Sequence, residues 1–256
     1  MSVETCAQIV RKSDPDRFFA TMTAAPDQRA KLFAIYAFNV EVAHLPWVSG
    51  EPLIAEMRLQ WWQDSIEAMF NEATVLQHEV ITVLAQVVRE CGLNKSDFTE
   101  LIAARRWDIY SDPFQDLADM QNYLKATSGN LMAIAGQALG IDPPAVEAAR
   151  DYGAAAGLAG FLQAVPELTA RGRVPLPDAG NDFLRGLAKE ALIRMDQARG
   201  NRALLPALPA LLAGAQARPI LKLVVKQPER VAAGRLGRSE FRRKGRLLVQ
   251  SLLRRW

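Results

Sequence analysis

The stretch PDQRAKLFAIYAFNVEVAHLP, residues 26–46, decides the fold of this chain. It begins with a proline and an acid, as many helices do, and its apolar residues then recur every three or four positions. This pattern predicts one long helix that ends before the last proline of the stretch. Phe33, Phe38, Glu41 and His44 fall on one face of that helix, so we expect this face to line a pocket.

The remaining sequence has the same helical character. Apolar residues recur at three and four positions between breaks at Pro, Gly and Asp, and no segment alternates as a half-buried strand does. The chain has 256 residues, of which 50% are hydrophobic and 23% charged, and this suits one all-α domain with a full core. We expect residues 1–217 to form this domain and residues 218–256 to form a basic helical tail on it.

Composition argues against several classes of protein. Cys6 and Cys91 lie far apart without zinc-site spacing, which predicts two reduced thiols. No basic segment followed by an apolar run opens the chain, so we expect no secretory signal. The longest apolar tracts, residues 153–165 and 204–215, are shorter than the roughly 20 residues of a membrane-spanning helix. We therefore expect a cytoplasmic protein.

Two other predicted helices bear on a pocket. Residues 52–70 form a helical pattern in which Leu53, Met57, Trp61 and Met69 share an inward face, with Leu59, Trp62 and Ile66 beside it. Residues 153–161 are mostly Gly and Ala, whose small side chains allow a neighbouring helix or a ligand to approach closely. Both close packing and a ligand wall are consistent with this segment.

Four aspartates follow one another at a spacing that metal ligands on a helix also use: Asp108, Asp112, Asp116 and Asp119. Pro113 argues against a metal site, because the residue before a proline is pushed out of helical geometry. Asp112 is therefore predicted to cap the next helix, and the aspartates are predicted to have structural or solvated roles.

Three segments, in this order, resemble the squalene/phytoene synthase family: residues 32–38 (LFAIYAF), 123–129 (YLKATSG) and 171–177 (RGRVPLP). The resemblance covers roughly residues 5–215. It implies the all-α isoprenoid synthase fold, a helical barrel around a central apolar cavity. Enzymes of this family join two prenyl diphosphates, which they hold through Mg²⁺ on two acidic motifs that face each other across the barrel.

The acidic motifs are degenerate at the positions where the resemblance places them. The first motif falls on Ala43, His44 and Trp47. The second retains a single acid, and its positions are Gly160, Gln163, Ala164, Glu167 and Leu168. Mg²⁺ binds oxygen ligands in octahedral geometry, and ionising an allylic diphosphate needs the metal to stabilise the leaving charge. We therefore expect no head-to-head synthesis, no bound metal and no cofactor.

One branch of the family, the assembly factors of respiratory NADH dehydrogenase (complex I), lacks the same motifs. Residues 37–43 (AFNVEVA) and 57–62 (MRLQWW) resemble that branch, because Asn39 and Val40 replace the Cys-Arg pair that is usual in the enzymes. The resemblance implies a non-catalytic protein whose partners are complex I subunits or assembly intermediates.

Two other functions stay open. A phytoene or squalene synthase-like transferase would use Glu41, Asp108 and Glu167 with Mg²⁺, and a prenyl- or lipid-binding module would use the apolar cavity without a metal. The residues that the resemblance and the helix pattern place around the pocket are Phe33, Phe38, Glu41, His44, Arg58, Trp61, Asp108, Tyr123, Glu167 and Arg173. The polar members are equally expected as buried partners that hold the helices in register.

Glu41 and His44 also form a Glu-x-x-His pair, which di-iron bundles use. Such sites need a second pair, and His78 has no glutamate three residues before it. We therefore expect Glu41 to be hydrogen-bonded to His44 or to Arg58 instead.

Positive charge is concentrated in the tail. From residue 218 onward there are 12 Lys and Arg against two acids, a balance of +10, which leaves −7 for the first 217 residues. Leu248, Leu252 and Trp256, with Val249 and Leu253, form an apolar stripe. Such a basic amphipathic helix suits an anionic membrane surface on the inner face of the membrane, and no module for nucleic acid is recognisable. The candidate membrane contacts are Arg242, Arg243, Lys244, Arg246, Arg254, Arg255 and Trp256.

Overall fold

The computed structural model describes residues 2–48, 51–71, 77–110 and 112–256. These residues form helices joined by loops and contain no strand, so the all-α prediction is confirmed. The α-helices are α1 (Val3–Ser13), α2 (Pro15–Thr21), α3 (Pro26–Val48), α4 (Pro52–Phe70), α5 (Glu79–Cys91), α6 (Lys95–Ala104), α7 (Leu117–Leu124), α8 (Asn130–Ala138), α9 (Pro143–Ala170), α10 (Asn181–Gly200), α11 (Leu208–Leu211), α12 (Ala217–Lys226) and α13 (Glu240–Leu252). Short η segments include η1 (Arg105–Asp108), η2 (Lys125–Gly129), η3 (Arg202–Ala207), η4 (Leu212–Gly214) and η5 (Pro228–Arg230).

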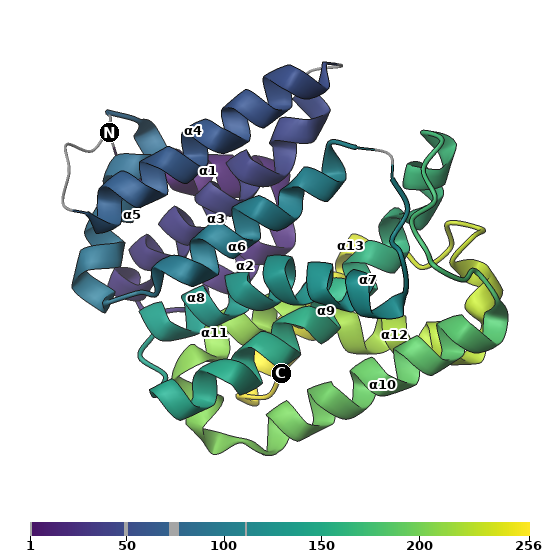
Figure 1. The fold of residues 1–256 in the computed structure, drawn as a ribbon. Coiled ribbons are helices and arrows are strands. Elements are labelled where there is room, and N and C mark those ends of the chain that lie inside the picture. The colour runs from purple at the N-terminus through teal and green to yellow at the C-terminus, as the bar shows by residue number, and fades with distance from the viewer. Residues whose placement is uncertain (1, 49–50, 72–76, 111) are drawn as a thin grey trace.

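Helix α3 is central to the fold, in keeping with its apolar sequence. It packs against α1, α4, α5 and α8, and Leu32, Ile35 and Phe38 are completely buried. Helix α9 is the second central element, because it contacts α8, α10 and α12. Figure 1 shows α4 along the upper edge of the molecule and α10 along the lower edge, with the other helices between them.

The predicted end of α3 is wrong. The helix continues through Pro46 and ends at Val48. A proline lacks one backbone N–H and therefore removes a single hydrogen bond from the helix. Because Pro46 lies in the last turn of a 23-residue helix, the remaining bonds and the packing of the helix outweigh that loss.

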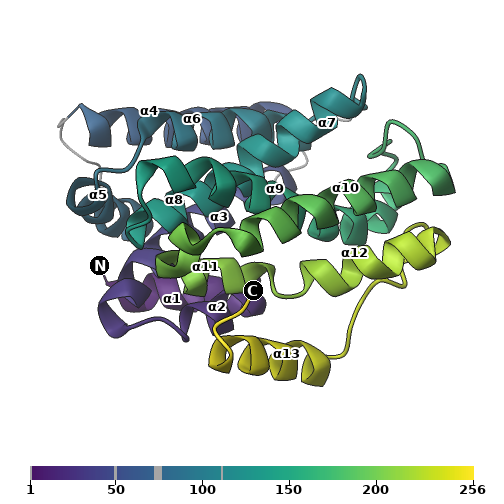
Figure 2. The same cartoon turned by 90° about the horizontal axis from the view of Figure 1, so that it is seen from below.

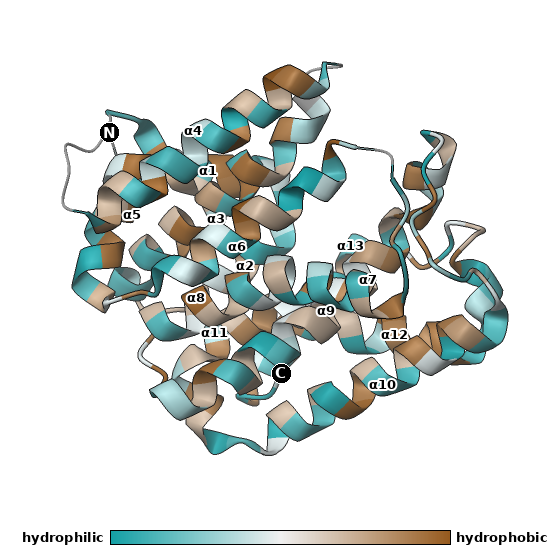
Figure 3. Cartoon of the chain, in the orientation of Figure 1, coloured by the Kyte–Doolittle hydropathy of each residue, from teal (hydrophilic) through white to brown (hydrophobic). Residues whose placement is uncertain are grey.

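Three of the four residues predicted on the inward face of α4 are exposed, so most of that prediction is wrong. Leu53 is 71% exposed and Met57 is 65% exposed, and Trp61 lies at the surface with them. The buried side is formed by Met69 and by Leu59, Trp62 and Ile66, which the sequence pattern predicts beside the inward face. Apolar residues occur on both sides of this helix, and bands of both hydropathy colours follow one another along α4 in Figure 3. Spacing alone therefore fits two faces, and packing against α3 and α6 selects the second.

Asp112 does not cap a helix. Helix α7 begins five residues later, and the carboxylate of Asp116 caps it by accepting a hydrogen bond from the Asp119 backbone N–H at 2.8 Å. No group of three or more His, Cys, Asp and Glu side chains in the described ranges is arranged to hold a metal ion.

The C-terminal region consists of two helices with different surroundings. Helix α12 packs against α9 and α10, whereas α13 contacts α2 and the short η4 turn at the edge of the molecule (Figure 2). Trp256 is only 6% exposed, so its placement on the membrane-facing stripe is wrong. In the described part of the chain no single helix has the length and apolar character to cross a membrane, although the bent pair Arg202–Gly214 and Ala217–Lys226 meets those two criteria together.

Candidate functional site

A cavity of about 540 Å³ lies between α3 and α9. Tyr36, Asn39 and Val40 of α3 form one wall, and residues of α9, including Gly157, form the wall opposite. The phenol oxygen of Tyr36 and the amide oxygen of Asn39 are buried without a hydrogen-bond partner in the described residues. Burial raises the pKa of Tyr36, which keeps this phenol neutral.

Only part of the predicted pocket lines this cavity. His44, Asp108 and Tyr123 belong to its lining. Phe33 and Phe38 are instead buried in the core, where Phe33 stacks on Phe18 and Phe38 packs edge-on against Trp62 and Phe98. The other predicted members lie away from the cavity lining: Glu41, Arg58, Trp61, Glu167 and Arg173.

The surface of α4 accounts for two of those misplacements. Arg58 is exposed on α4. Trp61 contacts Trp62 and His78 edge-on at the outer side of the same helix. The placement of Trp61 follows from the wrong choice of inward face for this helix, whereas Arg58 is expected at the pocket from the family resemblance.

The predicted hydrogen bond of Glu41 is absent from the described residues, where no such bond joins it to His44 or to Arg58. Glu41 is partly buried, and the negative charge of its carboxylate raises the pKa of Cys6 in α1. Burial chiefly raises the pKa of Cys6 to about 11, and the carboxylates of Glu79 and Glu41 add to the shift. His44 is exposed at the cavity instead, so the Glu-x-x-His pair does not form one site.

Asp108 and Tyr123 come together in a buried triad with Arg105. The Tyr123 hydroxyl donates to one Asp108 carboxylate oxygen at 2.9 Å, and Arg105 Nη1 donates to the other at 3.0 Å. Arg105 also donates to the Tyr123 oxygen at 3.0 Å. Burial raises the pKa of Tyr123, and the negative Asp108 raises it further. The triad is internally neutralised, which leaves Asp108 without a free carboxylate oxygen for a metal.

Arg173 anchors the 171–177 loop to η1 from outside the cavity lining. Its Nη1 donates to the Asp108 carbonyl oxygen at 2.9 Å, and its Nη2 donates to the carbonyl oxygens of Trp107 and Tyr110. Its guanidinium carbon also lies 4.3 Å from the centre of the Trp107 ring. Burial lowers the pKa of Arg173. The arginine therefore has a structural contact set, formed by carbonyl oxygens and an aromatic face.

Charged groups elsewhere in the cavity wall are paired in the same way. Asp14 bonds to Arg17 at 2.6 Å, and Asp16 pairs with Arg243 at 3.3 Å. Burial raises the pKa of Asp16, against the opposing effect of Arg243. Together with the Arg105 triad, these pairs leave the cavity without an uncommitted cluster of acids or cations among the residues described.

The positions of the two degenerate motifs meet at the cavity rim. Ala43, His44 and Trp47 of α3 line it on one side, and Gly160, Gln163, Ala164 and Leu168 of α9 line it on the other. Trp47 lies beneath Arg171, whose guanidinium carbon is 4.7 Å from the ring centre. Arg171 in turn bonds to Glu167 at 2.7 Å. The one acid that the second motif retains is thus paired with an arginine.

These side chains do not fit Mg²⁺. The rim offers an imidazole, an indole and an amide, whereas Mg²⁺ requires near-octahedral oxygen coordination with carboxylates or phosphates. The carboxylates of Asp14, Asp16 and Asp108 are each held by an arginine. No step that depends on a metal can be derived from this set of residues.

The glycines of α9 divide between packing and the cavity. A Cβ atom on Gly153 would lie 2.4 Å from the Met132 Cβ, and one on Gly157 would lie 2.4 Å from the Ser128 Cβ. A Cβ on Gly160 would meet nothing within 4 Å. The first two glycines therefore permit α9 to approach η2 and α8 closely, and Gly160 faces open space at the cavity rim.

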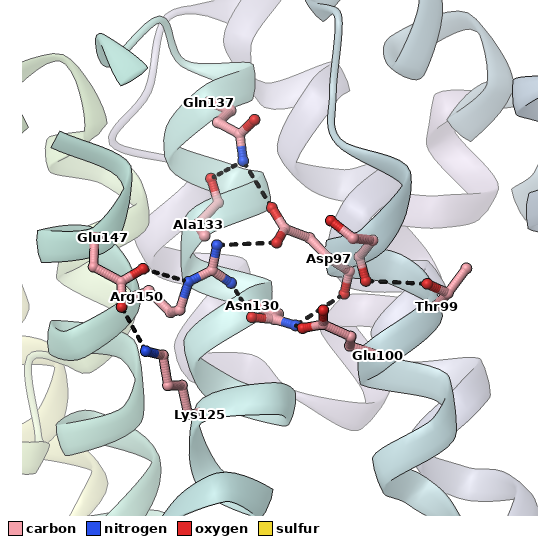
Figure 4. A network of polar contacts seen from close by, with 10 residues as sticks. Asp97, Thr99, Glu100, Lys125, Asn130, Ala133, Gln137, Glu147 and Arg150 are labelled. Carbon is pink, nitrogen blue, oxygen red and sulfur yellow. Dashed lines mark hydrogen bonds and ion pairs between the residues drawn. The ribbon is translucent and has the colours of Figure 1, made fainter. Parts of the chain in front are cut away.

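A second polar network was not predicted from the sequence. Asp97 of α6 bonds to Arg150 of α9 at 3.0 Å and to Gln137 of α8 at 3.0 Å, as Figure 4 shows. Arg150 also donates to Asn130 and pairs with Glu147 at 3.0 Å. The network joins three helices. Its signal in the sequence is weak, because a single buried acid on α6 looks like any other helical acid until its partners are known.

Comparison with known proteins identifies the family. A family model described as squalene/phytoene synthase matches residues 10–218. The chain belongs to the squalene/phytoene synthase family. Its fold is that of the family as well, because a dehydrosqualene synthase crystal structure superimposes with a TM-score of 0.82 at 19% identity, covering 98% of this chain and 96% of that one.

Relatives of this chain include proteins named as complex I assembly factors and a protein named as a phytoene synthase. The Bos taurus protein "NADH dehydrogenase (ubiquinone) complex I, assembly factor 6" is 28% identical over 199 residues, which cover 77% of this chain and 59% of the relative. The Drosophila melanogaster homolog of that factor is 32% identical over 197 residues, covering 74% and 58%. The 15-cis-phytoene synthase of Synechocystis sp. is 25% identical over 187 residues, covering 68% and 55%. The chain thus spans less than two thirds of the length of these relatives.

Proposed function

We propose that this protein is a non-catalytic member of its family that assists the assembly of respiratory complex I. The observation that carries the proposal is the state of the cavity rim, where Trp47 and Arg171 are stacked and Glu167 is paired with Arg171. Assembly-factor relatives that are 28% and 32% identical support the same assignment. Its partners would be complex I subunits or assembly intermediates, reached through surface contacts.

Removal of the protein from cells that make it tests this function. We expect isolated membranes to lose NADH:ubiquinone oxidoreductase activity and fully assembled complex on native gels. Re-expression of the wild-type chain, and equally of Glu167→Gln, would restore both. Unchanged amounts of assembled complex in the depleted cells would refute the proposal.

A direct assay separates this function from the transferase alternative. Purified protein would be incubated with farnesyl or geranylgeranyl diphosphate, Mg²⁺ and NADPH, and diphosphate release would be followed. We expect no release above the protein-free control. Turnover at enzyme-like rates that Glu167→Gln abolishes would refute the non-catalytic assignment.

A lipid-binding role is a second candidate, favoured by the cavity itself. Its volume of about 540 Å³ is typical of small-molecule sites, and burial of a prenyl or acyl chain needs no metal. Gly160→Leu would place a side chain into open space at the rim. We expect native mass spectrometry to detect a chain-like ligand on the wild type and on the surface control Gly186→Leu, and to detect less of it on Gly160→Leu. Equal occupancy in all three would count against this role.

The proposed location is the inner face of the membrane, where the protein would be held peripherally. This location suits a factor that acts on a membrane complex. The basic C-terminal region supports it through its charge balance of +10.

A further inference from the structure

Helix α13 has one face on the body of the protein and the opposite face in solvent. On the inner face, Arg246 Nε donates to the Ala215 carbonyl oxygen at 2.8 Å, and Arg243 pairs with Asp16 at 3.3 Å. These contacts fix how the helix is rotated. Figure 2 shows α13 forming the lower edge of the molecule, so its other face points outward.

The outward face carries three large apolar side chains, which we call the outer stripe. Phe241 is 86% exposed, Leu248 62% and Leu252 74%. They are seven and four residues apart and therefore lie along one side of the helix. Exposed apolar residues that line up in this way mark an interaction surface, because single exposed residues would be scattered.

A groove of about 380 Å³ lies beside the outer stripe, between α13 and the end of α10. Its apolar walls include Val249 and Leu253, and its charged side chains are Arg199, Arg246 and Arg255. No acid contributes to its lining within the described ranges. We call this feature the arginine groove.

The positive charge of the arginine groove is not neutralised by an ion pair among the described residues. None of its three arginines forms an ion pair with a carboxylate in the part of the chain that the structure describes. Asp196 attracts Arg199 electrostatically without a hydrogen bond to it. The two carboxylate oxygens of Asp196 instead accept hydrogen bonds from Arg218 at 2.6 and 3.1 Å. Burial lowers the pKa of Arg246, and the charge of Arg238 and other nearby arginines lowers it further. An anion in the groove would relieve this mutual repulsion.

We propose that the arginine groove binds the phosphate of an anionic phospholipid while the outer stripe enters the membrane beside it. Guanidinium groups bind phosphate oxygens in a bidentate manner. The apolar walls and the adjoining stripe assign the phosphate to a lipid, since a free phosphate needs neither. This inference rests on the proposed location at a membrane and specifies the surface that makes the contact.

Vesicle flotation tests the inference on the full chain, with vesicles of phosphatidylcholine alone or with phosphatidylglycerol added. We expect binding only to the anionic vesicles. The double variant Arg199→Gln, Arg255→Gln changes two exposed arginines and should weaken that binding about 30-fold. The triple variant Phe241→Ser, Leu248→Ser, Leu252→Ser should weaken it at least about tenfold. Circular dichroism melting curves would verify that each variant is folded.

Matched controls carry the same changes elsewhere on the surface. Arg89→Gln with Arg235→Gln removes the same charge outside the groove, and Leu53→Ser, Met57→Ser, Ile193→Ser removes three apolar residues exposed by 71%, 65% and 58%. These controls should bind within about threefold of the wild type, because the arginine control alters only long-range attraction and the apolar control lies outside α13. Controls that weaken binding as much as the test variants would overturn the proposal.

The remaining outcomes identify other occupants of this surface. Equal binding to the phosphatidylcholine vesicles and to those with phosphatidylglycerol would show that the net negative charge of the lipid is not recognised, and would overturn the proposal. Inorganic phosphate that binds the wild type but not the Arg199→Gln, Arg255→Gln variant in calorimetry, without releasing the wild type from vesicles at constant ionic strength, would assign the groove to free phosphate and overturn the lipid role. A wild-type dimer that the stripe variant converts to monomer in sedimentation would assign the stripe to a second copy of the chain. Because flotation needs no complex I, each result is independent of the assembly function.

Discussion

The indole ring of Trp47 lies beneath the guanidinium group of Arg171, with 4.7 Å between the guanidinium carbon and the ring centre. Trp47 stands at a position of the first degenerate motif, and Arg171 follows the second motif, whose one acid, Glu167, it pairs with at 2.7 Å. Through this contact the end of α3 is joined to the loop after α9. The contact therefore gives the rim a structural role.

Trp47→Ala should loosen the 171–177 loop without unfolding the protein. A partly exposed cation–π contact contributes about 0.5–1 kcal/mol, and the loop keeps the buried contacts of Arg173. We expect a free energy of unfolding lower by about this amount and faster amide exchange in the loop. In a double-mutant cycle with Arg171→Gln, the second substitution should cost less once the first is present. Fully additive effects would show that the two side chains are not coupled.

Cys6 should make stability fall with rising pH between about 9 and 11. The thiol pKa is raised from 9.0 to about 11 in the folded protein, so the unfolded chain releases its proton first. The native thiol therefore favours folding below pH 9, and this contribution is lost as the pH rises toward 11. Two pK units correspond to at most roughly 2–3 kcal/mol.

The pH prediction is tested by urea unfolding of the wild type and Cys6→Ala at pH 8, 9, 10 and 11. The difference between the two proteins isolates Cys6 from the buried tyrosines, whose pKa values are also raised. We expect the wild type to lose its advantage stepwise across this range. A difference that does not change with pH would contradict the assignment.

The sequence predicts the fold of this protein better than it predicts the direction of individual side chains. Helix α3 begins at Pro26 as expected, because proline at a first helical position and an acid after it are strong local signals. The inward face of α4 could not be chosen, since Leu53 and Leu59 both belong to regular apolar series. Only contact with α3 and α6 distinguishes the two series.

At the candidate site, too, the sequence predicts where residues lie better than it predicts which side chains they contact. The motif positions His44 and Gly160 lie at one cavity rim, where the family resemblance places them. Tertiary contacts decide whether a polar side chain stays free or pairs with an arginine. Asp108 forms a triad with Arg105, a residue that local spacing does not single out. The spacing of Trp256 places it on the outward stripe of α13, but α13 ends at Leu252 and the chain then turns back.

Gly157 and Gly160 should respond in opposite ways to the same substitution. A Cβ on Gly157 would lie 2.4 Å from both the Cβ and the Oγ of Ser128, so Gly157→Ala forces two helical segments apart and should cost about 1–3 kcal/mol. Gly160→Ala meets open space and should stabilise the helix by about 0.5–1 kcal/mol through its better helix propensity. Thermal and urea unfolding of the two variants measures the contrast, and equal effects would show that close packing is not the reason for Gly157.

The Asp97–Arg150 pair should behave as a buried ion pair whose partners are more costly to separate than to replace together. Arg150→Met leaves the Asp97 carboxylate, which is almost completely buried, with only its Gln137 bond, and it should destabilise the protein by about 3–5 kcal/mol. The double variant Asp97→Asn, Arg150→Met removes the uncompensated charge and should recover a large part of that loss. Arg194→Met, which breaks the exposed pair with Glu190, is the matched control and should cost less than about 1 kcal/mol. If the double variant were less stable than Arg150→Met alone, the unpaired carboxylate would not be the source of the cost.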